Sequence, residues 1–187
     1  MLQLESLDVK SFMVKNPHVK EEDHIDRWLE ETQLPGAVDL EVEGIVDRIN
    51  GLRRRFSRML DETLADFGLN DGEWKALGHL QLAGPPHRRP VGQLAKRADL
   101  SSGAMTNRLD RLEQAGLVRR VPDPDDRRGV LVELTDAGRT AWEQSVSAQA
   151  EKESLVAAAL SAKEKQQLNA LLRRLMREFE RREQKPS

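Results

Sequence analysis

The chain has 187 residues, of which 38% are hydrophobic, 33% charged and 4% aromatic, with a formal net charge of −2. This balance is typical of a helical protein with long amphipathic helices, and the few aromatic residues disfavour a large β core. The absence of cysteine excludes disulfides, thiolate zinc sites and a cysteine nucleophile, and it fits a reducing compartment. Because no stretch approaches about 18 apolar residues, we expect no membrane partner and a cytoplasmic location.

Residues 1–36 are expected to form an N-terminal extension. Residues 1–20 are weakly patterned, whereas Ile25, Trp28 and Leu29 recur at helical spacing and predict a short helix over 22–32. The sequence Leu34-Pro35-Gly36 ends that helix.

Long apolar stripes precede and follow the centre of the chain. A helix over 40–67, ended by Gly68 as its C-cap, is predicted within a dimerisation segment at 37–68. Two further helices are predicted over 136–183, the first capped by Thr135 and the second by Ser161 with Glu164. A small domain cannot cover stripes of this length, so we expect a homodimer whose terminal helices form the interface. The stripe residues are Val42, Ile45, Val46, Ile49, Leu52, Phe56, Met59, Leu60 and Leu64, and then Leu168, Leu171, Leu172, Leu175, Met176 and Phe179.

The central segment is basic although the chain as a whole is acidic. Between Gly84 and Val130 there are ten Lys and Arg and six Asp and Glu, a balance of +4, so the remainder carries −6. Such a distribution is typical of a protein that contacts phosphate with one region only, and it would place the chain on the nucleoid. The alternative is an ordinary set of solvated helix faces.

Residues 69–135 predict three helices, of which the last two are joined by a short turn, followed by a hairpin. Asn70 and Glu73 form a capping box, Pro90 begins the next helix, and a third helix runs from Ser102 to about residue 115 before Gly116. Two short strands over 117–121 and 130–134 flank a polar loop. This order predicts a winged helix-turn-helix, in a mainly α fold with a small β-hairpin wing.

The third helix has the two faces that a recognition helix requires. Met105, Leu109 and Leu112 define its buried stripe. Small and polar side chains on the other side could approach base edges in the major groove, and hydroxyl groups at the N-terminus could meet a phosphate. The DNA-contacting candidates on this helix are Ser101, Ser102, Gly103, Thr106, Asn107 and Arg111.

The loop of the hairpin supplies the other candidate contacts. Asp126, Arg127 and Arg128 stand at its tip, where a guanidinium could enter the minor groove and the carboxylate could hold it. The alternatives are a solvated turn, or a winged helix that binds another protein without specific DNA binding.

Residues 94–98, 100–113, 116–118 and 123–135 strongly resemble the MarR family of transcriptional regulators, and the layout of helices fits that family over 40–179. The resemblance implies a homodimer with interlocked N- and C-terminal helices and repression relieved by a small ligand. It places Thr106 and Asn107 at the major groove, and Arg128 with Asp126 in the wing.

The added N-terminal helix and the Thr106-Asn107-Arg108 run resemble the subgroup of urate-responsive and PecS-like regulators. In that subgroup a tryptophan, an acid and two arginines line the ligand site, which implies Trp28, Arg108 and Arg120 here. The acid position holds Lys75, a departure that favours a more anionic ligand over urate. The alternative for Trp28 is a core or dimer anchor.

No catalytic, cofactor or metal site is expected. His18, His24, His79 and His87 have no ligand spacing, and the chain has neither a phosphate-binding glycine loop nor a nucleophile elbow.

Overall fold

The computed structural model describes residues 22–32, 35–98, 100–126 and 129–184. The chain divides after Phe56 into two compact units. No helix among the described residues is both long and apolar enough to cross a membrane.

The first unit consists of α2 (His24–Glu31) and the N-terminal part of α3 (Leu40–Ala65). Asp23 caps α2 by accepting hydrogen bonds from the Ile25 and Asp26 amides, and the Asp26 carboxylate accepts a hydrogen bond from the Asp23 amide. The Arg48 guanidinium of α3 binds both carboxylates, with Nε 3.0 Å from Asp23 Oδ2. This ion-pair cluster fixes the short helix against α3.

The side of α3 that α2 covers is not its apolar side. Ile25 is buried, and Leu29 lies against Gly44, where a Cβ would be 3.4 Å from the Leu29 methyl group. Gly44 and Arg48 share one face of α3 because they are four residues apart. The apolar stripe follows other positions, and its members stay exposed: Val42, Ile45, Val46, Ile49, Leu52 and Phe56.

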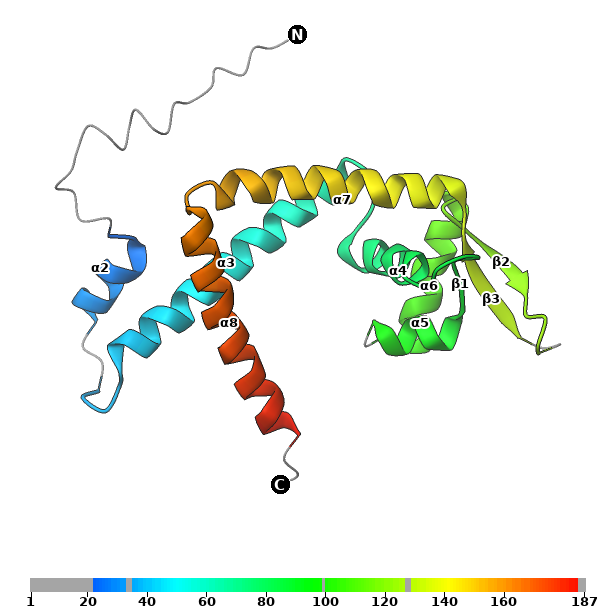
Figure 1. Ribbon diagram of the computed structural model, residues 1–187. Coiled ribbons are helices and arrows are strands. Elements are labelled where there is room, and N and C mark those ends of the chain that lie inside the picture. The colour runs from blue at the N-terminus through cyan, green and yellow to red at the C-terminus, as the bar shows by residue number, and fades with distance from the viewer. Residues whose placement is uncertain (1–21, 33–34, 99, 127–128, 185–187) are drawn as a thin grey trace, which may run out of the picture. The chain divides into compact units, whose positions relative to one another are not determined.

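The second unit contains the remaining elements. They are α4 (Asp71–Gln81), β1 (Arg88–Pro90), α5 (Val91–Arg97), α6 (Ser102–Gln114), β2 (Val118–Pro122), β3 (Val130–Leu134), α7 (Asp136–Ala157) and α8 (Ala162–Glu183). In Figure 1, α4, α5 and α6 gather beside the three strands, at one end of α7.

Local sequence signals set the boundaries of these helices. The capping boxes Asn70/Glu73 and Ser161/Glu164 are both present, and Thr135 Oγ1 accepts the Gly138 amide at 3.0 Å. These caps confirm the predicted starts, because a side-chain oxygen satisfies amides that have no intrahelical partner.

The core of this unit lies where α4, α5 and α6 meet the sheet. Burial of each large aliphatic side chain there stabilises the fold by about 1.5–3 kcal/mol relative to exposure. The fully or almost fully buried members include Leu64, Leu77, Leu80, Leu94, Met105, Leu109, Leu112, Val118 and Val132.

The sheet has three strands, so the prediction of a two-stranded hairpin was incomplete. Its order is β1-β3-β2 and both pairings are antiparallel, with Arg88 opposite Glu133 and Pro90 opposite Leu131. Three residues that end in proline give no strand periodicity, and proline suits an edge strand because it has no amide to donate. Pro90 therefore ends β1 and occupies the N-cap position of α5, which begins at Val91, one residue later than predicted.

The long helix α3 ends at Ala65, two residues earlier than predicted. The Leu69 amide bonds the Leu64 carbonyl at 3.0 Å, and Gly68 has a φ of 66°. This is a glycine-terminated helix end, so the predicted C-cap role of Gly68 is confirmed.

Buried polar side chains join α7 to α3 and α4. Trp74 Nε1 donates to Ser145 Oγ at 2.9 Å, and Thr63 Oγ1 lies 3.0 Å from Gln149 Oε1. Ser145, Thr63 and Gln149 are all buried. Because an unpaired buried polar group is costly, these bonds specify how α7 packs on the two other helices.

Candidate nucleic-acid interface

One face of α6 is exposed and small or polar. Met105, Leu109 and Leu112 are buried, as the periodicity predicts. The DNA-contacting candidates on this helix are all exposed: Ser101, Ser102, Gly103, Thr106, Asn107 and Arg111.

The hydroxyl groups at the start of α6 organise its first turn. Ser101 Oγ accepts the Ala104 amide at 3.2 Å, and Thr106 Oγ1 donates to the Ser102 carbonyl at 2.9 Å. A Cβ built on Gly103 would meet nothing within 4 Å. Packing inside the chain therefore does not require glycine there, and the space beside it is open to a groove.

Arg111 differs from the other candidates because it is ion-paired. Its Nε lies 2.9 Å from Glu73 Oε1, with the arginine side chain 61% exposed and that of Glu73 7% exposed. The second oxygen, Glu73 Oε2, accepts the Asn70 amide at 3.1 Å. Glu73, in the first turn of α4, thus holds the exposed guanidinium of Arg111 on α6.

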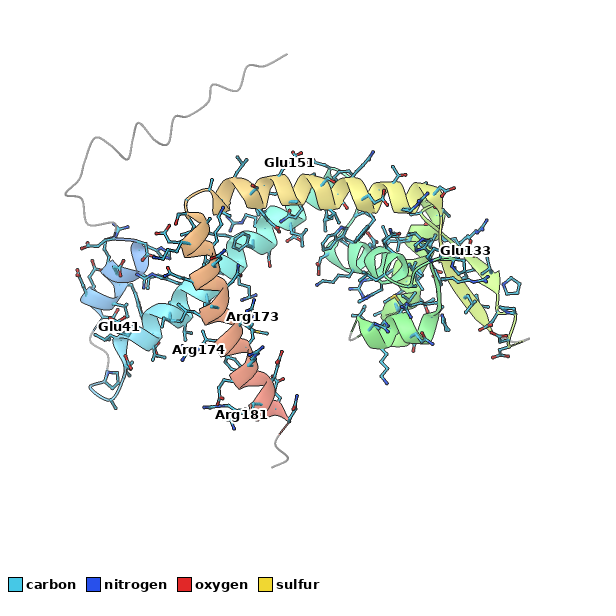
Figure 2. The ribbon with its side chains drawn as sticks, viewed as in Figure 1. Glu41, Glu133, Glu151, Arg173, Arg174 and Arg181 are labelled. Carbon is cyan, nitrogen blue, oxygen red and sulfur yellow. The ribbon has the colours of Figure 1, made fainter. Side chains whose placement is uncertain are left out.

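The outer face of the sheet also carries arginines. Glu133 of β3, labelled in Figure 2, lies between Arg88 of β1 and Arg119 of β2. Its Oε1 accepts Arg119 Nε at 3.1 Å, and its Oε2 lies 4.0 Å from Arg88 Nη1. One carboxylate therefore partly neutralises two cations.

The base of the wing loop closes by backbone bonds. The Asp123 amide donates to the Gly129 carbonyl at 3.0 Å, and the Gly129 amide donates to the Asp126 carbonyl at 2.8 Å. Arg127 and Arg128 lie outside the described residues, so their predicted groove contacts stay predictions.

Two of the four ligand-binding candidates have carboxylate partners. Lys75 Nζ lies 2.6 Å from Asp71 Oδ2. Arg120 Nη2 donates to Asp110 Oδ1 at 2.6 Å, and Arg120 also pairs with Glu113; the hydrogen bond to the Asp110 carboxylate raises the pKa of the Arg120 guanidinium. Neither cation is free to neutralise a ligand without competition.

Arg108 points back to the protein body, because it lies beside Met105 and Leu109 of the buried stripe of α6. Its guanidinium lies over Gly72 in the first turn of α4, where any Cβ would overlap it. Its Nη1 is buried and has no hydrogen-bond partner among the described residues. Arg108 and Arg111 therefore both lie at the start of α4, where Arg111 is paired with Glu73 and Arg108 Nη1 has no partner among the described residues.

The fourth candidate, Trp28, belongs to the first unit. It is 41% exposed and lines a pocket of about 430 Å³ together with His24, Ile25, Asp47 and Arg54. The described residues contain no group of three His, Asp or Glu side chains that could hold a metal ion.

Sequence reasoning did not find two features of these sites. The acid Glu73 was visible as a helix cap, but nothing local indicated its pairing with Arg111. Arg54 lies in the run Arg53-Arg54-Arg55, for which the sequence favours a solvated helix face over contact with phosphates or a cleft at a dimer interface, and only the pocket beside Trp28 distinguishes Arg54.

Comparisons with known proteins identify the family. A model described as "MarR family" matches residues 67–129. The HTH-type transcriptional regulator PecS of Dickeya dadantii is 32% identical over 153 residues, covering 82% of this chain and 90% of PecS. The chain belongs to the MarR family.

Solved structures agree with this assignment. Apo MarR of Escherichia coli is 30% identical with a TM-score of 0.61, covering 69% of this chain and 93% of MarR. A mutant of that MarR, solved in complex with operator DNA, is 30% identical with a TM-score of 0.58, and the match covers 74% of this chain and 99% of the mutant's chain. These relatives confirm the resemblance and the winged-helix fold of the MarR-family chain. PecS is named as a transcriptional regulator and YetL of Bacillus subtilis as a transcriptional repressor, and neither name describes an enzyme.

Proposed function

We propose that this MarR-family chain is a dimeric, ligand-responsive repressor that binds a pseudo-palindromic operator. The observation that carries the proposal is the exposed face of α6, where Gly103, Thr106 and Asn107 leave room for base edges. A relative that was solved in complex with operator DNA supports the proposal that this chain binds an operator.

The dimer follows from exposed apolar surface at both ends of the chain. In the first unit α2 occupies the glycine side of α3 and leaves the apolar stripe exposed. No residue of α8 is buried, although six large apolar side chains follow one of its faces. A second copy of the chain would cover this surface, and its two-fold symmetry would place operator half-sites about 10 bp apart.

The ligand response rests on Trp28 and Arg108. Trp28 offers an exposed aromatic face in a pocket beside Arg54, and Arg108 carries a buried donor without a partner in the described chain. Both features favour an anionic or aromatic small molecule. Lys75 and Arg120 would bind an anionic ligand only if that ligand displaced their carboxylate partners.

The DNA-binding part is tested with duplexes selected from a random library by the wild-type chain. Replacing Asn107 with alanine should weaken binding by about 1–3 kcal/mol, as expected for one lost base contact, and should reduce discrimination against a scrambled duplex. Arg128→Ala should cost a similar amount. The matched control is Gln114→Ala, at the far end of α6, which should bind within about twofold of wild type.

Fluorescence anisotropy across a salt series provides the measurement, because phosphate contacts make affinity fall steeply with salt. Selection of no preferred duplex, with weak and salt-insensitive binding, would support the rival function of a winged-helix protein-interaction module. The ligand is sought by thermal shift over small carboxylates and purines, followed by release of the selected duplex and by a reporter assay that distinguishes repression from activation.

A further inference from the structure

Glu73 is a buried carboxylate with two different partners. Oε2 accepts the Asn70 amide at 3.1 Å and so completes the capping box of α4. Oε1 lies 2.9 Å from Arg111 Nε, on the exposed side of the helix that we propose enters the major groove. The side chain is almost entirely removed from solvent, so both contacts are made in one fixed position.

The capping role alone does not account for a carboxylate at this position. A glutamine would cap α4 equally well, because its side-chain oxygen can also accept the Asn70 amide. A negative charge beside a DNA-binding face also opposes phosphate binding. The charge of Glu73 therefore needs a function that offsets this repulsion.

We propose that Glu73 is a positioning residue for operator binding, which holds Arg111 by its Nε while the rest of the guanidinium stays available to DNA. This inference rests on the proposed function. An arginine fixed in one geometry loses less conformational freedom when it binds, so pre-organisation improves both affinity and discrimination between sequences.

The decisive variant is Glu73→Gln, measured on the duplex that the wild-type chain selects. It keeps the cap and removes the charge. Long-range electrostatics alone would strengthen DNA binding, because the variant loses one negative charge and the net charge of the chain rises by one unit. Positioning predicts the opposite, a three- to tenfold weaker affinity with an unchanged salt dependence, since Arg111 keeps its charge.

A matched control exists in the second capping box of the unit. Glu164 Oε2 accepts the Ser161 amide at 2.8 Å, as Glu73 does for Asn70, and no arginine is paired with it in the described chain. Glu164→Gln makes the same chemical change at the start of α8, and it should leave operator affinity within twofold of wild type.

A double-mutant cycle with Arg111→Ala separates positioning from a purely structural effect. Arg111→Ala should weaken binding more than Glu73→Gln and should lower the slope of log affinity against log salt by about one. Adding Glu73→Gln to Arg111→Ala should change affinity by less than twofold, because the arginine that Glu73 positions is gone.

Arg111→Lys provides a second route if Glu73→Gln does not fold, as judged by circular dichroism. It keeps the charge but lacks Nε, so it should bind more weakly than wild type. Tighter or equal binding by Glu73→Gln, wild-type binding by Arg111→Lys, or full additivity in the cycle would overturn the inference and leave the proposed function intact. Failure of the wild-type chain to select any duplex would overturn the proposed function itself.

Discussion

At the scale of single residues, the buried polar side chains of the described chain connect one helix to another. Thr63 of α3 meets Gln149 of α7, Ser145 of α7 accepts from Trp74 of α4, and Glu73 of α4 pairs with Arg111 of α6. Each contact satisfies a group that burial would otherwise leave unpaired. Directional bonds of this kind define one packing of the helices, which apolar contacts alone would define less sharply.

Ser145→Ala tests the cost of breaking one such contact. The Ser145 hydroxyl accepts from Trp74 Nε1 at 2.9 Å and donates to the Trp142 carbonyl at 2.8 Å. Its removal leaves a half-buried indole N–H without its acceptor, so the free energy of unfolding should fall by about 1–3 kcal/mol. Urea denaturation followed by tryptophan fluorescence measures the change.

The matched control on the same helix is Ser147→Ala. Ser147 is exposed, and its hydroxyl bonds only the Glu143 carbonyl of its own helix, at 3.0 Å. The free energy of unfolding of the Ser147→Ala variant should stay within about 0.5 kcal/mol of the wild-type value. If both variants lost the same free energy of unfolding, the hydrogen bond between Ser145 and Trp74 would contribute nothing to stability.

At the scale of elements, α8 carries its own stabilising contacts while its apolar face remains uncovered. The Ser161/Glu164 capping box closes its first turn. In its last turns Glu178 accepts from Arg181 at 2.6 Å and from Arg182 at 2.7 Å. Local bonds therefore define the ends of the helix, but most of a helix's stability in a protein comes from packing of its apolar face, and we expect a partner to provide that packing.

The contacts of Glu178 with Arg181 and Arg182 should be detectable in a pH titration. Hydrogen bonds from Arg181 and Arg182 lower the pKa of Glu178 from 4.5 to about 2. Because the folded-state pKa is depressed, the contribution to stability is fully present above about pH 4.5 and is lost as the pH falls towards 2. Carboxyl-carbon NMR should place the Glu178 midpoint well below 4.5.

Replacing both Arg181 and Arg182 with glutamine should return that midpoint towards the ordinary value. An unchanged midpoint in the double variant would rule out the two guanidinium groups as the cause.

At the scale of the whole molecule, the exposed apolar residues belong mainly to the terminal helices. The α3 stripe in the first unit and the α8 stripe in the second are both exposed, whereas the winged-helix core is buried. Contiguous apolar surface of this kind is uncommon on monomers and marks an interface. This contrast is the basis for assigning the terminal helices to dimerisation and the centre to DNA.

A charge placed on the α8 stripe should dissociate the dimer. Leu171 is 55% exposed in the single chain, and Leu171→Asp would bury an unpaired carboxylate in the proposed interface. Multi-angle light scattering at micromolar concentration should give twice the chain mass for wild type and the monomer mass for the variant. Gln166→Asp, on the opposite face of α8, should remain dimeric; a folded wild-type monomer at that concentration would contradict the assignment.

The sequence by itself determined the features that depend on near neighbours. The caps at Asn70 and Ser161 were predicted correctly because each bond joins residues three positions apart. The buried stripe of α6 followed from helical periodicity, and the turn and wing motifs were sufficient to identify the family.

Only the tertiary structure decided which distant residues meet. The strand β1 exists because Arg88 and Pro90 pair with β3, and no pattern within three residues encodes that pairing. The pairing of Glu73 with Arg111, and of Arg120 with Asp110, likewise depends on how packed elements orient side chains. Local sequence sets helix ends through short-range hydrogen bonds, whereas the partner of a charged side chain is set by which faces the core brings together.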